Sequence, residues 1–166
     1  LIIAVVCIAA SGYVINNILD YEADRINAPK RLVIREKISE KSAYNLFFAL
    51  NIMGVGLGFY IANKIDTPAF SAIFILTSVL LYLYATYLKH IAIAGNLVIS
   101  MLVGLVVLLP VIFDLYPEIT SENIKNQRML FNTLVYYSLY ATLLNFVREI
   151  IKDQEDINGD YKTQSN

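Results

Sequence analysis

The chain has 166 residues, of which 57% are hydrophobic and 16% are charged, and its formal net charge is −1. Soluble domains are typically about 45–50% apolar and about 25% charged, so the composition argues against a soluble protein. The near-neutral charge does not favour a nucleic-acid partner, and the single Cys7 excludes a disulfide framework within this sequence.

Five uncharged stretches are long enough to cross a hydrocarbon core of about 30 Å, which takes about 20 helical residues. In chain order they cover residues 1–19, 42–63, 67–88, 91–113 and 129–147. They are too long and continuous for the alternating strands of a membrane barrel, and helices satisfy their own backbone polar groups in lipid. We therefore predict an all-α fold, a polytopic transmembrane helical bundle.

A few polar residues and prolines predict local features of these spans. Ser39 is expected to cap the second span, and Thr67, which precedes a proline, the third. Pro110 should kink or end the fourth span near its outer end. Asn51 and Asn96 lie inside spans and are expected to form hydrogen bonds between helices rather than to contact substrate.

The polar connections alternate between two sides if each span crosses the membrane once. Residues 20–41, 89–90 and 148–166 then share one side, and residues 64–66 and 114–128 share the other. The first side carries ten Lys and Arg residues and the second carries three. Because positively charged loops stay in the cytoplasm, we predict a multi-pass protein of the plasma (inner) membrane with the first side cytoplasmic.

A first polar motif, NNILDYEAD, begins at Asn16 near the end of the first span. Asn16, Asp20 and Asp24 follow an i, i+4, i+8 spacing, which places them within roughly 80° of one helix face. A single acidic cluster at a helix end is common and is usually only a solvated surface, so this motif alone carries little weight.

A second polar motif, REIIKDQEDINGD, follows the fifth span on the same predicted side. Asp153, Asp156 and Asp160 follow an i, i+3, i+7 spacing and also share one helix face. Arg148 and Lys152 continue that face toward the membrane. Two carboxylate-rich faces in one compartment favour a functional site over two unrelated solvated helix ends.

Two opposed carboxylate faces suit the binding of a diphosphate through Mg²⁺. This ion prefers oxygen ligands and usually binds through one or two carboxylates plus substrate phosphates. Nearby Arg and Lys side chains would neutralise the remaining phosphate oxygens, and the whole would stabilise a departing pyrophosphate. The apolar region beneath would hold a long hydrocarbon attached to the diphosphate.

The residues in both motifs resemble those of a known family. Asn16, Asp20 and Asp24, followed by Asn27 and Pro29, resemble the first motif of the UbiA superfamily of intramembrane prenyltransferases. The KDxxDxxxD arrangement that begins at Lys152 is similar to that superfamily's second motif. The second segment is most similar to the branch of geranylgeranylglycerol-phosphate geranylgeranyltransferases. Asn17 departs from the pattern, since the family usually has Asp there.

The resemblance implies a nine-helix bundle around a central cavity, of which residues 1–166 would form a single transmembrane prenyltransferase domain without the first helix and the last three. It implies an enzyme that transfers a prenyl group from a prenyl diphosphate to an acceptor, with Mg²⁺ as cofactor and release of pyrophosphate. Partners would be that diphosphate, a lipid or aromatic acceptor and membrane lipid, with no nucleic acid and no evident protein partner. The implied catalytic residues are Asp20, Asp24, Asp153, Asp156 and Asp160. The implied metal ligands are these five and Asn16, and the implied diphosphate-binding residues are Asn16, Lys30, Arg31, Arg148 and Lys152.

The two enzyme hypotheses differ in the acceptor that receives the prenyl group. A geranylgeranylglycerol phosphate acceptor would give an ether lipid, whereas an aromatic acceptor would indicate quinone or pigment synthesis. A different class is a non-catalytic membrane protein, such as an isoprenoid-binding partner or a transporter subunit, which should tolerate loss of the motif carboxylates. Soluble terpene synthases also use acidic metal motifs, but five membrane-length spans exclude that class.

Overall fold

The computed structural model describes residues 1–27, 29, 32–91 and 93–164, with backbone alone for 155–164. Its described part contains these α-helices: α1 (Ile2–Leu19), α2 (Tyr21–Asn27), α3 (Glu40–Lys64), α4 (Ser71–Thr86), α5 (Ala94–Pro110) and α6 (Ile124–Gln164). Short helical turns join them: η2 (Pro68–Phe70), η3 (Leu88–His90), η4 (Val111–Leu115) and η5 (Tyr116–Glu118). The described residues form no strand beyond one isolated bridge between Ile34 and Ile38, which confirms the all-α prediction.

Five helical segments are long and apolar enough to cross a membrane, as predicted. They are Ile2–Leu19, Glu40–Lys64, Pro68–Thr86, Ala94–Glu118 and Ile124–Gln154. The fifth differs from its predicted bounds because α6 continues without a break through the second motif. At 1.5 Å per residue its 41 residues span about 60 Å, roughly twice a hydrocarbon core, so the motif lies on a helical extension.

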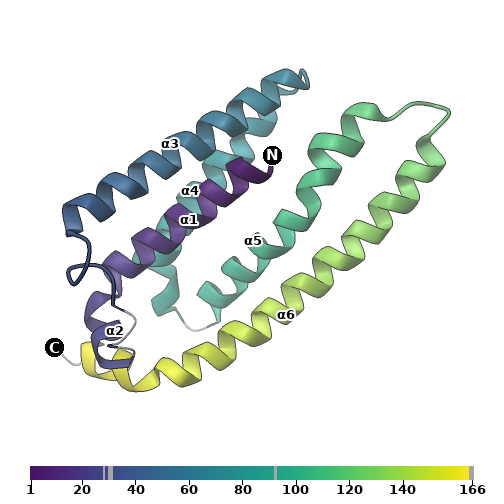
Figure 1. Cartoon of the computed structure of the whole chain (residues 1–166). Coiled ribbons are helices and arrows are strands. Elements are labelled where there is room, and N and C mark those ends of the chain that lie inside the picture. Colours follow the sequence, from purple (N-terminus) through teal and green to yellow (C-terminus); the bar gives the residue numbers. More distant parts are fainter. Residues whose placement is uncertain (28, 30–31, 92, 165–166) are drawn as a thin grey trace.

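The helices pack in two groups that meet at one end of the bundle (Figure 1). Helix α1 packs against α3 and α4, while α5 and α6 form an antiparallel pair, and α4 also contacts α5. The short α2, which carries part of the first motif, packs against α6, which carries the second. The chain therefore brings both acidic motifs to the same end, as the alternation of spans predicts.

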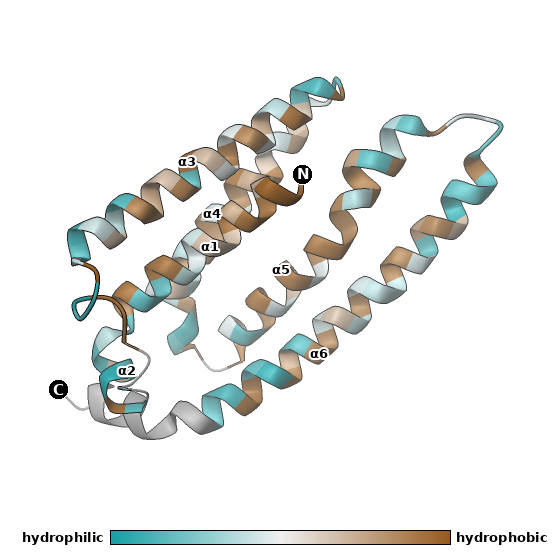
Figure 2. Ribbon diagram, viewed as in Figure 1, coloured by the Kyte–Doolittle hydropathy of each residue, from teal (hydrophilic) through white to brown (hydrophobic). Residues whose placement is uncertain are grey.

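Many large apolar side chains of this bundle are exposed, which is unlike a soluble protein. Ile2 and Ile52 are 79% and 73% exposed, and Figure 2 shows hydrophobic residues along the lengths of α1 and α5. Polar Ser11 and Ser100 are buried, as are apolar core residues such as Phe74. Apolar surface costs nothing in lipid, so helices associate through small and polar residues that allow close approach.

The predicted local features hold at most positions. The Ser39 hydroxyl accepts a hydrogen bond from the Ser42 amide at 3.1 Å and caps α3. Helix α5 ends at Pro110, after which the chain forms the π-helical turn η4. The prediction for Thr67 was wrong in one respect. It precedes the 3₁₀ turn η2 and its side chain makes no capping hydrogen bond, because a 3₁₀ turn presents its first amides in a different geometry from an α-helix.

Candidate functional site

The first motif lies across a break between two helices. Helix α1 ends at Leu19, and Asp20 adopts φ −86° and ψ 4° before α2 begins. The backbone stays hydrogen-bonded through the break, because the Asp24 amide donates to the Asp20 carbonyl at 2.8 Å. The Asn16 side-chain amide donates to Asp20 Oδ2 at 2.6 Å. Asn16 and Asp20 therefore face the same side, as their spacing predicts, while Asp24 lies in the first turn of α2.

The loop that follows α2 is tied back to the first motif by Arg35. Its guanidinium carbon lies 4.5 Å above the Tyr21 ring. One of its nitrogens lies 2.9 Å from Glu40 at the start of α3, and another lies 3.6 Å from Glu22 on α2. We call this group of four residues the Arg35 latch. Because it joins α2 to the start of α3, it limits the movement of the segment that carries Asp24.

The second motif lies on the uninterrupted helix α6. Asp153 Oδ2 accepts a hydrogen bond from the Asn96 side-chain amide on α5 at 2.6 Å, so Asn96 is the inter-helix partner that was predicted. Asn51 is as well, since it accepts a hydrogen bond from Ser78 on α4. One turn before Asp153, Glu149 is buried and pairs with Arg148, with 2.5 Å between Oε1 and Nη1.

Four of the predicted site residues cannot be placed in this way. The side chains of Asp156 and Asp160 lie outside the described residues, although the backbone of α6 passes through both positions. Lys30 and Arg31 lie outside the described residues altogether. The geometry of the site therefore comes from the remaining members of both motifs.

The junction between α4 and α5 contacts both motifs. Lys89 in η3 forms an ion pair with Asp20, and the two side chains are only 14% and 23% exposed. Seven positions later, Asn96 holds Asp153. A Cβ atom on Gly95 would lie 2.7 Å from the Leu88 carbonyl oxygen, so only glycine permits this tight approach. The turn η3 and the start of α5 thus hold acids of two distant segments.

The role of Lys89 was not predicted from the sequence. The sequence indicated Lys89 only as one of the ten Lys and Arg residues on the predicted cytoplasmic side. Its partner Asp20 is 69 positions away, and no local spacing links the two residues. One signal was present, since the alternation of spans puts residues 89–90 on the same side as both motifs. A cation in a short turn on that side was therefore a candidate partner for a motif carboxylate.

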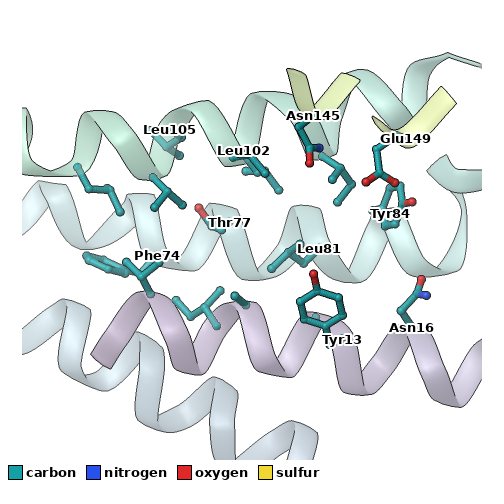
Figure 3. A pocket seen from close by; sticks show the side chains of 18 of the residues that line it. Tyr13, Asn16, Phe74, Thr77, Leu81, Tyr84, Leu102, Leu105, Asn145 and Glu149 are labelled. Atoms are coloured by element: carbon teal, nitrogen blue, oxygen red, sulfur yellow. The ribbon is translucent and has the colours of Figure 1, made fainter. Parts of the chain in front are cut away.

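A pocket of about 320 Å³ lies between α1, α4, α5 and α6. Figure 3 shows its apolar part, lined by Phe74, Leu102 and Leu105, and its polar end, where Asn16, Asn145 and Glu149 point inward. Arg148 and Lys152 also line this polar end. Three of the predicted diphosphate-binding residues, Asn16, Arg148 and Lys152, therefore lie around one cavity.

Tyr84 connects the two motifs at the polar end of the pocket. This residue on α4 lines the pocket at the same end as Asn16 of the first motif and Glu149 of the second (Figure 3). Residues of both motifs therefore lie near a single side chain.

The residues at this end fit a divalent cation that takes some of its ligands from the protein and the others from a substrate. Asn16 Oδ1 is buried and has no hydrogen-bond partner within the described part of the chain, and it lies beside the Asp20 carboxylate. Among the described side chains, no three His, Cys, Asp or Glu residues gather into a metal cluster. Mg²⁺ does not require one, because it usually takes one or two carboxylates and completes its shell with phosphate and water oxygens.

Comparison with known proteins agrees with these observations. The UbiA prenyltransferase family model matches residues 1–165. A digeranylgeranylglyceryl phosphate synthase from Methanobrevibacter smithii is 33% identical over 158 residues, which cover 95% of this chain and 52% of that protein. The corresponding proteins from Methanopyrus kandleri and Thermococcus sibiricus are 38% and 39% identical; the matches cover 95% and 90% of this chain, and 50% and 47% of those proteins.

The chain spans about half the length of the curated relatives it matches. No solved structure gives a significant match to it.

Proposed function

The chain belongs to the UbiA prenyltransferase family, and we propose that its protein transfers a prenyl group from a prenyl diphosphate to a lipid-type acceptor. The acceptor we propose is geranylgeranylglycerol phosphate, which would give an ether lipid and release pyrophosphate. Relatives that are 33% to 39% identical carry the name digeranylgeranylglyceryl phosphate synthase, which supports this acceptor over an aromatic one. Residues 1–166 would supply the second to sixth helices of that enzyme.

One observation carries the proposal: polar residues of both motifs, Asn16 from the first and Glu149 and Lys152 from the second, line the polar end of an apolar pocket in a membrane-spanning bundle. A prenyl diphosphate has the same division, with a hydrocarbon chain and a highly charged head. The apolar wall of Phe74, Leu102 and Leu105 would hold the hydrocarbon and exclude water from it. The diphosphate would then lie beside Asn16, Arg148 and Lys152.

The chain's own residues divide into metal ligands and cations. The proposed Mg²⁺ ligands are Asn16, Asp20, Asp24, Asp153, Asp156 and Asp160. When bound there, Mg²⁺ would supply positive charge that stabilises the departing pyrophosphate. The cations that would neutralise the remaining phosphate oxygens are Lys30, Arg31, Lys89, Arg148 and Lys152. Lys89 already neutralises Asp20, so it is positioned to turn toward a phosphate when a divalent ion takes its place.

The proposal also includes the side of the membrane on which the two acidic motifs lie. The end of the bundle that carries both motifs also carries the excess of Lys and Arg, and positively charged ends stay in the cytoplasm. We therefore expect the acidic motifs on the cytoplasmic side of the plasma (inner) membrane.

The test is a product assay on the full-length protein in nanodiscs, supplied with geranylgeranyl diphosphate and Mg²⁺. Geranylgeranylglycerol phosphate and a panel of aromatic acceptors would be offered separately, with products read by mass spectrometry. We expect an ether product that disappears with EDTA and in Asp20→Ala and Asp153→Ala. The matched control is Asp114→Ala, an exposed acid in η4 at the other end of the bundle, which should retain full activity.

Other outcomes would change the proposal in distinct ways. An aromatic product alone would keep the diphosphate chemistry and replace the acceptor. Binding of the diphosphate without any product, unaffected by Asp20→Ala, would indicate a non-catalytic isoprenoid-binding protein and contradict the proposal.

A further inference from the structure

Glu149 is a buried acid that the proposed metal and diphosphate sites do not use. Its side chain is 6% exposed, and it lies at the start of the second motif, just beyond the predicted span of residues 129–147. A buried carboxylate is costly unless it is paired, so its burial beside a cavity needs an explanation. The ion pair with Arg148 compensates the charge of the carboxylate, but it does not by itself account for an acid that faces a cavity.

Glu149 differs from the motif aspartates in where it points. Among the described residues that line the pocket, it alone carries a carboxylate. Asp20 and Asp153 stay outside the lining, where they are held by Lys89 and Asn96. The acids proposed as metal ligands therefore surround the polar end, whereas Glu149 faces the interior (Figure 3).

Glu149 lies along α6 at about the level where the bond between the prenyl chain and the diphosphate would break. It precedes Asp153 by four residues on one continuous helix, which places it about 6 Å closer to the apolar wall. With the diphosphate held at the level of Asp153 and Lys152, the first carbon of the prenyl chain would lie near the level of Glu149. Tyr84 on α4 lies near Glu149 at the same end of the pocket, so polar groups from two helices line this level.

We propose that Glu149 is the general base that accepts the proton of the acceptor's hydroxyl during prenyl transfer, an inference that rests on the proposed function. The hydroxyl oxygen forms a bond to the first carbon of the prenyl chain. The bond from that carbon to the diphosphate oxygen breaks, and its electron pair leaves with the pyrophosphate. The hydroxyl proton passes to the Glu149 carboxylate, so the step needs no other reactant.

Loss of a general base should change the rate of one step of the reaction and not the other. The base is needed for attack by the acceptor but not for ionisation of the prenyl diphosphate, so the two steps should respond differently to its loss. Loss of a general base typically slows its step by about 100-fold or more. A residue that only positions Arg148 would slow ionisation instead, because Arg148 is one of the proposed diphosphate-binding residues.

The experiment separates the two steps in the full-length protein in nanodiscs. Ionisation would be followed as scrambling of ¹⁸O from the bridging to the non-bridging positions of geranylgeranyl diphosphate, in the presence of an acceptor analogue whose reactive hydroxyl is replaced by hydrogen. Transfer would be followed as ether product with the normal acceptor. We expect Glu149→Gln to lower product formation at least about 100-fold while scrambling stays within a few-fold of wild type. The control is Glu122→Gln, an exposed acid at the opposite end, which should change neither rate.

Each result has a separate meaning. Product formation near the wild-type rate in Glu149→Gln would overturn the proposal, and so would an equal loss of product and scrambling, which would make Glu149 a positioning residue. If Glu149→Gln does not fold, Glu149→Asp takes its place: its carboxylate is one methylene further from the hydroxyl, so transfer should still fall more than scrambling. Absence of both product and scrambling in the wild-type protein would instead contradict the proposed function itself.

Discussion

The two acidic motifs reach the same end of the bundle by different structural routes. The first lies across a break at Asp20, and its acids depend on contacts from elsewhere: Lys89 pairs with Asp20, and the Arg35 latch holds α2. The second lies on the continuous helix α6, where the helical repeat alone sets the relative directions of its side chains. Its one described cross-helix contact to an aspartate is the hydrogen bond from Asn96 to Asp153.

This difference shows two ways to place a charged group at a membrane surface. A long helix that continues out of the bilayer carries its side chains at fixed angles, and each additional residue costs little once the helix has formed. A helix break allows a carboxylate to turn toward a partner, but the geometry then relies on tertiary contacts. The second motif should therefore be sensitive to helical register, and the first to the loss of single distant side chains.

The largest difference between the two motifs should appear when one residue is inserted beside each of them. One alanine added after Phe146 in α6 rotates everything beyond it by about 100°, which turns Glu149 away from the pocket and Asp153 away from Asn96. We expect activity to fall at least about 100-fold, since small displacements of reacting groups have effects of that size. One alanine added between Glu36 and Lys37, in the exposed loop after the first motif, interrupts the turn in which the Arg35 amide donates to the Ile38 carbonyl and so loosens the Arg35 latch. It should cost no more than about 5-fold, because the contacts of that latch are largely exposed. Product assays on both variants would check this, and equal losses would contradict the comparison.

The next largest effect should come from Lys89→Ala. Its removal leaves the partly buried Asp20 carboxylate without its cation, and hydrogen bonds to charged groups contribute about 1.5–3 kcal/mol. We expect kcat/KM for the prenyl diphosphate to fall about 10- to 100-fold. Lys125→Ala, an exposed lysine at the opposite end, is the matched control. A Lys89→Ala enzyme with unchanged kinetics would show that the first motif does not need this distant contact.

Gly95→Ala tests the junction that serves both motifs. The added Cβ would lie 2.7 Å from the Leu88 carbonyl, so the turn must shift, and overpacking of this kind costs about 1–3 kcal/mol. We expect a lower midpoint of thermal unfolding in detergent. Gly56→Ala is a suitable control, because a Cβ there meets no atom within 4 Å. An equal shift in both variants would argue against a specific role for the junction.

The smallest effect should come from Arg35→Ala. The Arg35 latch is largely exposed, with the Arg35 side chain 45% and the Glu40 side chain 42% exposed, and each exposed ion pair or cation–π contact contributes about 0.5–1 kcal/mol. We expect about a 2- to 5-fold loss of activity, together with faster proteolysis of residues 32–39. The difference from wild type should shrink at high salt, because screening already weakens the ion pairs. Arg128→Ala, exposed at the other end, should leave both readouts unchanged.

Much of the fold could be predicted because membrane spans follow from composition. Charge-free stretches gave all five spans, and their alternation placed both motifs at one end. The shared direction of Asn16 and Asp20 also followed from helical spacing. Helical spacing also predicted a helix through the second motif, and the structure shows it as the uninterrupted continuation of the fifth span. Hydropathy alone would have ended that helix earlier, because a hydropathy pattern ends where charges begin, whereas a helix continues as long as its backbone hydrogen bonds do.

The sequence by itself determined the helical membrane class of the protein, its spans and the shared direction of Asn16 and Asp20, since each depends on residues within a few turns of one another. The tertiary structure decided which acids face the pocket and which are held outside it. Lys89 meets Asp20 across 69 positions, and Asn96 meets Asp153 across 57. Such pairings leave no trace in local spacing, because in lipid the packing of small residues sets how helices approach, and this approach selects the polar partners. Gly54 lies against α1 and Gly104 against α6 in this way.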